Sequence, residues 1–258
     1  MENKPLNILL TNDDGIHAPG IWALYRALKS VHRPVVVAPE RERSAVSHAI
    51  TLHKPLRAFK VTLNEGNEGW AVTGTPADCV KLAMLELLDE PPQLVISGIN
   101  AGANTGVNLN YSGTVAAAKE ATLYGVPALA TSIQGGDTFD FDGAARFIAR
   151  LAPKVLAQGL PAGVLLNINF PNRAVDQIAG VRIARQGCDL YDEYIEKRSD
   201  PRNRSYYWQG YESQPVYARP DSDGALMEKG YVTLTPVQCD MTDYDTMERL
   251  RQWDVEVG

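Results

Sequence analysis

Two adjacent carboxylates, Asp13 and Asp14, follow a short apolar run near the start of the chain. The run at residues 8–10 is bounded by turn residues, which predicts a strand buried on both faces of a parallel sheet. Apolar residues then recur at helical spacing from Ile21, so the two acids lie in the loop between the first strand and the first helix. This loop lies at the carboxyl end of the strand, and ligands of an open α/β sheet bind at the edge formed by these carboxyl ends. Two carboxylates that converge there repel each other unless a cation lies between them, although one helix cap and one solvated acid would explain the same pair.

Polar side chains also follow two other predicted strands. Ser44 lies in the loop after the apolar strand at residues 34–39, and Asn100 lies in a glycine- and asparagine-rich loop after the strand at residues 94–96. If the three strands are neighbours, their loops bring two carboxylates, a hydroxyl and an amide oxygen to one edge of the sheet. These hard oxygen donors suit Mg²⁺ or Mn²⁺, whereas zinc would prefer clustered His or Cys side chains.

A fourth loop has the composition of an anion site. Ser112, Gly113 and Thr114 stand immediately before a predicted helix rich in alanine. Free backbone N–H groups at a helix N-terminus, together with two hydroxyls, can bind a phosphate, although most such tripeptides only cap a helix. A hard metal opposite a helix N-terminus is the arrangement expected for hydrolysis or transfer of a phosphoryl group.

The remaining chain alternates between predicted strands and helices. Strands are expected at residues 126–132 and 164–168, on either side of a helix at 141–156, and Thr75 with Pro76 is typical of a helix start. This alternation predicts an α/β fold with a doubly wound, mostly parallel sheet and helices on both faces. Residues 50–72 alternate more strongly, which indicates antiparallel strands with a hairpin that decorate the sheet.

The character of the chain changes after Pro171. Residues 191–217 are rich in Tyr, Arg, Asp and Pro, with Tyr206, Tyr207 and Trp208 at the centre. We expect an extended hairpin or arm whose exposed aromatics either form a subunit contact or pack on their own domain. A strand at residues 231–235 and a closing helix complete the chain.

The composition limits the classes of partner and compartment. A net charge of −6 argues against a nucleic-acid polymer as the main partner. The three cysteines form neither a zinc pattern nor a disulfide framework, as in proteins of a reducing compartment. With neither a signal peptide nor a long apolar segment, we expect a soluble, cytoplasmic protein.

Taken together, these motifs resemble the SurE family, the stationary-phase survival proteins. The matching segments are NDDG at 12–15, HAPG at 17–20, the Ser44 loop, GTPADCV at 74–80, SGINAG at 97–102, YSGTVAA at 111–117, DPR at 200–202 and YYW at 206–208. They are spread over essentially the whole chain, and their combination is specific although each piece alone is not. Asn203 and Ala121 depart from the family pattern, in which Gly is frequent at both positions, but neither is a candidate metal ligand.

The resemblance implies a division of the chain and of its functional residues. It implies a single domain over 1–258, with a Rossmann-like core at 1–180, an arm for oligomerisation into a dimer or tetramer at 181–230, and a C-terminal strand and helix at 231–258. The ligands of one divalent ion per subunit would be Asp13, Asp14, Ser44 and Asn100, and the phosphate contacts would be Ser112, Gly113 and Thr114. Asn104 would line the site.

We therefore predict a metal-dependent phosphatase that hydrolyses nucleoside 5′-monophosphates, with 3′-monophosphates left open. Asp13 and Asp14 are the predicted catalytic residues, and Asn12 or Asn104 could position the phosphate. A histidine, His17 or His48, could protonate the leaving group, although a lone histidine is more often structural. Two alternatives remain: a phosphate-binding module without turnover, and an interaction protein built around the arm.

Overall fold

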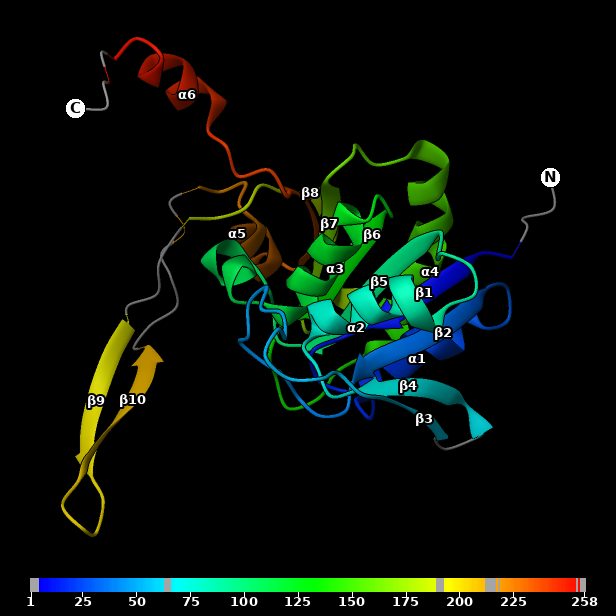
Figure 1. The fold of residues 1–258 in the computed structure, drawn as a ribbon. Helices are drawn as coiled ribbons and strands as arrows, with labels where there is room; N and C mark the ends of the chain where they lie inside the picture. Colours follow the sequence, from blue (N-terminus) through cyan, green and yellow to red (C-terminus); the bar gives the residue numbers. More distant parts are fainter. Residues whose placement is uncertain are drawn as a thin grey trace.

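The structure, a computed structural model, describes residues 5–62, 66–188, 193–211, 217, 219–253 and 255. Nine strands form one sheet in the order β3-β4-β2-β1-β5-β6-β7-β11-β8 (Figure 1). These strands are β1 (Asn7–Thr11), β2 (Arg33–Pro39), β3 (Ala58–Thr62), β4 (Glu68–Val72), β5 (Leu94–Ala101), β6 (Ala128–Ile133), β7 (Val164–Phe170), β8 (Gly180–Ile183) and β11 (Tyr231–Gln238). Among the described residues of this sheet, only the β3–β4 and β7–β11 pairs are antiparallel, so the predicted α/β fold with a mostly parallel sheet is confirmed.

Strand β1 lies near the middle of the sheet and pairs in parallel with β2 on one side and β5 on the other. Its three central residues are fully buried because helices cover both faces of the sheet. The three strands that carry the candidate ligands are therefore neighbours, and their loops emerge at the same edge.

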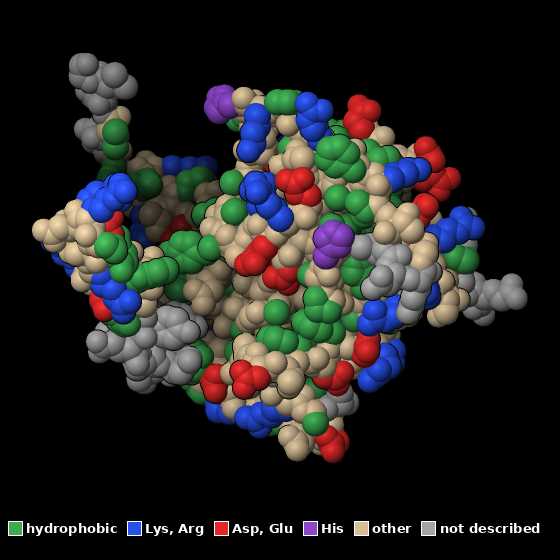
Figure 2. All heavy atoms as spheres, turned by 90° about the horizontal axis from the view of Figure 1, so that it is seen from below, with side chains coloured by type: hydrophobic (Ala, Val, Ile, Leu, Met, Phe, Trp, Pro, Cys, Tyr) green, Lys and Arg blue, Asp and Glu red, His purple; other side chains and the backbone are tan. Residues whose placement is uncertain are grey.

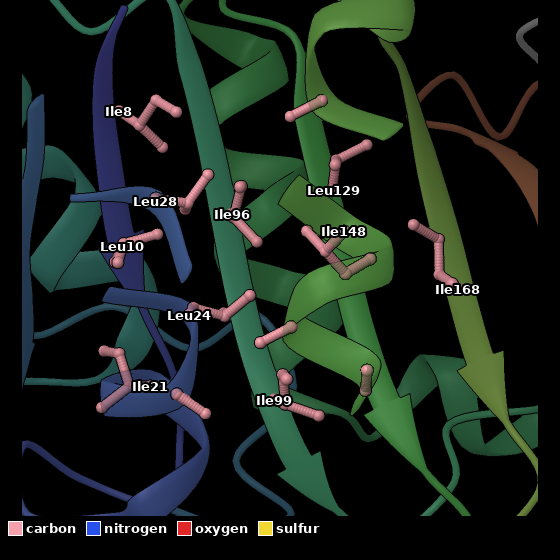
Figure 3. Close-up of a cluster of buried hydrophobic side chains, with 14 of the residues drawn as sticks. Ile8, Leu10, Ile21, Leu24, Leu28, Ile96, Ile99, Leu129, Ile148 and Ile168 are labelled. Carbon is pink, nitrogen blue, oxygen red and sulfur yellow. The ribbon is translucent and has the colours of Figure 1, made fainter. Parts of the chain in front are cut away.

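Helices lie against both faces of the sheet. Helices α1 (Pro19–Leu28) and α4 (Phe141–Gln158) pack against each other and against one face. Helices α2 (Pro76–Leu82) and α3 (Gly113–Leu123) cover the other face (Figure 1). Figure 3 shows how Leu24 of α1 and Ile148 of α4 point toward Ile96 and Leu129 of the sheet. Each of these four side chains is fully buried, so this contact fixes α1 and α4 on the sheet.

Several elements differ from their predicted bounds. Strand β5 continues to Ala101, past the predicted end at residue 96, with a register shift between Ser97 and Asn100. The hairpin expected in residues 50–72 begins only at β3. Helix α5 (Asp223–Glu228), which had no sequence signal, packs on β11. The short helical turns are η2 (Ala83–Leu87), η3 (Gly106–Asn110) and η4 (Val175–Gln177), and the closing helix is α6 (Tyr244–Leu250).

A two-stranded arm projects from this body, formed by β9 (Glu193–Ser199) and β10 (Ser205–Tyr211) (Figure 1). It occupies the middle of the predicted range 191–217, of which residues 191, 192 and 212–216 lie outside the described part. The range 181–230 assigned to the arm also contains most of β8 and all of α5, which belong to the body. Ile195, Tyr207 and Trp208 are exposed on the arm, which lies at the left of the space-filling view in Figure 2.

The face seen in Figure 2 shows basic and acidic side chains interspersed rather than gathered by sign. Among the described residues, no helix has both the length and the apolar character needed to cross a bilayer.

The contact between α4 and the sheet gives a stability prediction. Truncation of the fully buried Ile148 to alanine leaves a cavity under α4, so Ile148→Ala should lower the free energy of unfolding by about 2–5 kcal/mol. Leu123→Ala, which truncates a side chain that is 62% exposed, should change it by less than about 0.5 kcal/mol. Urea unfolding measures both, and equal losses would contradict this account of the core.

Candidate active site

The loop after β1 is a tight turn that brings Asp13 and Asp14 to the edge of the sheet. The Asn12 side chain closes this turn: its Nδ2 donates to the carbonyl of Gly15 at 2.9 Å, and its Oδ1 accepts from the Gly15 N–H at 3.1 Å. Gly15 has a φ of +97°, and a Cβ there would lie 3.0 Å from the backbone of Arg41. Only glycine fits this conformation easily. Asn12 is fully buried, and both polar atoms of its side chain bond to Gly15. The geometry therefore indicates that Asn12 shapes the turn and does not favour the predicted phosphate contact.

Backbone hydrogen bonds join this turn to the loops on both sides. The N–H of Arg43 donates to the Asp13 carbonyl at 2.7 Å, and Ser44 is the next residue after Arg43 in the chain. The N–H of Ala101 donates to Oδ2 of Asp14 at 3.4 Å, so Asn100 is likewise one residue away. The structure therefore gathers the loops of Asp13, Asp14, Ser44 and Asn100 at one edge of the sheet.

The N-terminus of α3 lies directly against Asp13. Ser112 is the N-cap, and its Oγ accepts from the N–H of Val115 at 3.1 Å. The Thr114 hydroxyl donates to Oδ1 of Asp13. A Cβ on Gly113 would lie 2.8 Å from Cβ and 3.0 Å from Oδ2 of Asp13. A side chain at position 113 would thus displace this carboxylate, and the structure brings the predicted metal and phosphate residues into contact.

The two acids are held in an environment that disfavours their negative charge. Asp13 is only 4% exposed, and burial raises its pKa although the Thr114 hydroxyl opposes the shift. Burial, followed by repulsion from Asp13 and from Glu42, raises the pKa of Asp14 to about 6. A cation between the two carboxylates would relieve both effects.

The donor set fits a hard divalent ion. Nδ2 of Asn100 donates to the carbonyl of Gly102 at 2.7 Å, which leaves Oδ1, the atom a cation would need, outside that bond. The Ser44 side chain is exposed, and its hydroxyl donates to Glu42 at 2.7 Å. Within the described part of the chain, no three His, Cys, Asp or Glu residues cluster as metal ligands. Two carboxylates with a hydroxyl and an amide oxygen suit Mg²⁺ or Mn²⁺ better than zinc.

Asn104 is fixed against the ends of the neighbouring strands. Its N–H donates to Oδ1 of Asn169 at 2.8 Å, its carbonyl accepts from Nδ2 of Asn167 at 2.8 Å, and its Nδ2 donates to the Ser132 hydroxyl at 2.8 Å. These bonds anchor the loop that follows β5. Asn104 is 8% exposed, so it holds this loop from the interior.

The two histidines near the site differ in their surroundings. His17 is exposed, whereas Nε2 of His48 lies 2.7 Å from Oε2 of the buried Glu120. Three acids near these loops, Glu42, Asp78 and Glu120, received no role in the sequence analysis. Asp78 and Glu120 contact residues distant in sequence, Thr51 and His48. Only the GTPAD helix start at 74–78, which places Asp78 at N3, offered any signal.

A hollow of about 780 Å³ opens beside the loop after β5. Its walls come from that loop and η3, from the base of the arm and from the end of α5. The lining includes Thr105, Asn108, Tyr111, Gln134, Gln209 and Met227. This volume lies within the range of small-molecule sites in proteins.

Comparisons with known proteins identify the family of this chain. Residues 8–193 match the family described as "Survival protein SurE". The "5'-nucleotidase SurE" of Desulfatibacillum aliphaticivorans is 55% identical over 97% of this chain and 99% of its own length. The protein of the same name from Moorella thermoacetica is 50% identical over 94% of each chain. The crystal structure of the SurE protein from Aquifex aeolicus superposes with a TM-score of 0.83, at 39% identity, over 95% of this chain and 98% of that one. With the family match covering most of its length and these relatives nearly all of it, this chain belongs to the SurE family.

Proposed function

We propose that the protein is a phosphoric monoester hydrolase that cleaves nucleoside monophosphates, in the first place 5′-monophosphates, to a nucleoside and phosphate. The observation that carries this proposal is the contact between Asp13 and the N-terminus of α3. It unites a group that attracts a cation with a group that attracts an anion. Close relatives carry the name 5′-nucleotidase.

The metal ligands in this proposal are Asp13, Asp14, Ser44 and Asn100, and they hold one Mg²⁺ or Mn²⁺ per subunit. Such an ion supplies positive charge to the phosphoryl oxygens and increases the acidity of water. Ser44 and Asn100 orient the site without adding charge, while Asp13 and Asp14 balance the charge of the ion. Asp13 also keeps its hydrogen bond from Thr114, which fixes the carboxylate in one orientation.

The phosphate contacts in this proposal come from Asn104, Ser112, Gly113 and Thr114. The first turn of α3 directs its N–H groups and positive end toward the phosphoryl group, and the Ser112 hydroxyl can donate to one oxygen. These donors are held by the helix before the substrate arrives, so they stabilise charge that builds on the phosphoryl oxygens during cleavage. Asp13 or Asp14 orients the attacking water or accepts its proton.

The hollow beside the loop after β5 provides room for the nucleoside. Its lining includes Gly102, Ala103 and Thr105, which follow the proposed ligand Asn100. A wall with polar and aromatic side chains, such as Asn108 and Tyr111, suits a ribose and a base.

We further propose that the arm joins subunits into a homodimer or tetramer. Tyr207 and Trp208 are each 60% exposed, and large aromatics on a projecting hairpin are typical of subunit contacts. We also infer a cytoplasmic location, which the free state of Cys79, Cys188 and Cys239 supports.

Removal of one acid tests the proposed function. Asp13→Asn retains the size of the side chain but loses its charge, so hydrolysis of nucleoside 5′-monophosphates with Mg²⁺ or Mn²⁺ should fall by roughly 10³-fold or more. EDTA should stop the wild-type reaction, and added Mn²⁺ should restore it. Phosphate release is measured over a panel of 5′- and 3′-monophosphates, p-nitrophenyl phosphate and short polyphosphate.

The matched control for this experiment is Asp89→Asn, the same change at an exposed position, which should keep wild-type activity. Turnover that persists in EDTA would refute the metal assignment. A wild-type protein that binds nucleotide but cleaves no phosphomonoester with either ion would instead identify a binding module.

The raised pKa of Asp14 gives a prediction for the ion-free protein. Because the folded state raises this pKa from 3.8 to about 6, ionisation of Asp14 destabilises the fold progressively as the pH rises from 4 through 6. Asp14→Asn should therefore raise the free energy of unfolding in EDTA at pH 8, by about 1–2 kcal/mol once solvent screening is allowed for. Near pH 4 the difference should vanish, because the wild-type acid is then protonated. Urea unfolding at both pH values measures this, and a variant less stable than wild type at pH 8 would contradict it.

The proposed role of the arm predicts a change in assembly. Trp208→Asp places a charge in the proposed subunit contact, so light scattering after gel filtration should detect a smaller species than the wild-type oligomer. Leu85→Asp introduces the same charge at a residue that is 64% exposed on η2, and its assembly should match that of the wild type. An unchanged oligomer in Trp208→Asp would argue against the arm as the contact.

A further inference from the structure

The loop that carries Ser44 has a backbone that needs outside support. Residues 44–51 form no helix or strand, and Ala45 and Ser47 have φ values of 54° and 53°. Residues with a side chain disfavour this left-handed conformation, so neighbouring contacts must hold it in place. If Ser44 is a metal ligand, its position depends on those contacts.

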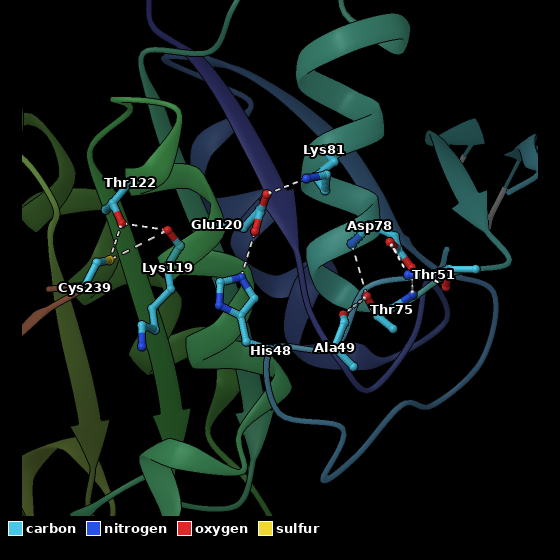
Figure 4. A network of polar contacts seen from close by, with 10 residues as sticks. All are labelled: His48, Ala49, Thr51, Thr75, Asp78, Lys81, Lys119, Glu120, Thr122 and Cys239. Carbon is cyan, nitrogen blue, oxygen red and sulfur yellow. Dashed lines mark hydrogen bonds and ion pairs between the residues drawn. The ribbon is translucent and has the colours of Figure 1, made fainter. Parts of the chain in front are cut away.

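Two buried carboxylates supply much of that support (Figure 4). Asp78 of α2, which is 2% exposed, accepts from the N–H of Thr51 at 3.0 Å and from its hydroxyl at 2.6 Å. Glu120 of α3, which is 5% exposed, lies 2.7 Å from Nε2 of His48. Thr75 adds a fourth bond, from its hydroxyl to the carbonyl of Ala49, at 2.7 Å. Hydrogen bonds thus hold the loop at three residues, 48, 49 and 51.

The same loop is also attached to the start of the anion site. The N–H of Ser47 donates to the carbonyl of Tyr111 at 3.0 Å, and its hydroxyl donates to the carbonyl of Asn110 at 2.7 Å. Tyr111 directly precedes Ser112, the N-cap of α3. Glu120 lies on α3 itself, so one helix both begins at the proposed phosphate contacts and holds the loop of a proposed metal ligand.

The surroundings of Glu120 make it a structural anchor that cannot shift freely. Its second oxygen, Oε1, lies 3.3 Å from Nζ of Lys81 on α2. The hydrogen bond to His48 is the largest of the effects that lower its pKa, which keeps the carboxylate charged. A buried, charged acid held between a histidine and a lysine has a single favourable position.

We infer that Glu120 and His48 are positioning residues that fix residues 44–51 and thereby set the affinity of the site for its divalent ion. This inference rests on the proposed function, because it takes Ser44 as a ligand. It gives His48 a role other than protonation of the leaving group: the imidazole holds the loop against α3. Outer partners of metal ligands typically change ion affinity by roughly 10- to 100-fold when they are mutated.

The test compares Glu120→Gln and His48→Gln with the wild type in the full-length protein. Mn²⁺ binding is measured by calorimetry, and backbone motion of residues 44–51 by hydrogen exchange. Both variants should bind Mn²⁺ roughly 10- to 100-fold more weakly and exchange faster in this loop. Saturating Mn²⁺ should restore turnover, because the chemical groups themselves remain. Glu86→Gln, the same change at an exposed position nearby on η2, should match the wild type in all three measurements.

Each contrary result has a distinct meaning. A folded Glu120→Gln variant with wild-type Mn²⁺ affinity and loop exchange overturns the inference. If that variant does not fold, His48→Gln decides by the same criteria, because the His48 side chain is 29% exposed and its replacement disturbs the core less. Turnover of His48→Gln that stays low at saturating Mn²⁺, with normal Mn²⁺ affinity, also overturns it and makes His48 an acid catalyst. Ser44→Ala separates the two levels: if this change leaves Mn²⁺ affinity intact, the proposed ligand set fails, whereas if only Ser44→Ala weakens binding, the positioning role alone fails.

Discussion

The contact between Asp13 and the first turn of α3 is the interaction on which both halves of the candidate site depend. A carboxylate that is 4% exposed is costly unless donors or cations face it. The Thr114 hydroxyl provides one such donor, and the absence of a side chain at Gly113 allows the acid to lie against the helix. Because the sheet edge and the helix start meet through this one side chain, the proposed metal and phosphate sites hold a fixed separation.

Much of this arrangement can be predicted from the sequence, because its signals are local. A short apolar run that ends in turn residues identifies β1, and the N-cap residue Thr75 marks the start of α2 as the structure has it. Helix α3 begins at Gly113, inside the tripeptide that was expected to precede it. The convergence of the loops followed from one condition, that β2, β1 and β5 are neighbours, and their pairing confirms it. Placement of the loops of Asp13, Ser44 and Asn100 at one edge then required no knowledge of side-chain contacts.

The parts that sequence reasoning missed depend on contacts between distant residues. His48 and Glu120 are 72 positions apart, and neither belongs to a pattern that would predict the other. Sequence reasoning also did not predict that the Asn12 amide would bond to the backbone of Gly15, since an asparagine beside two acids suits a ligand contact equally well. Strand β5 runs on to Ala101 because pairing with β6 resumes after the register shift, and a glycine-rich segment does not reveal such pairing.

The two halves of the candidate site therefore need different kinds of support. The proposed phosphate contacts lie at the start of a helix, whose backbone bonds hold them without further help. The Ser44 loop has no regular backbone hydrogen bonding of this kind and contains two residues in an unfavourable backbone conformation. Contacts with α2 and α3 must therefore hold it in place. Asp78 and Glu120 provide these contacts from helices already fixed by the core. A metal ligand on an irregular loop therefore requires these buried acids, although they lie outside the ligand set.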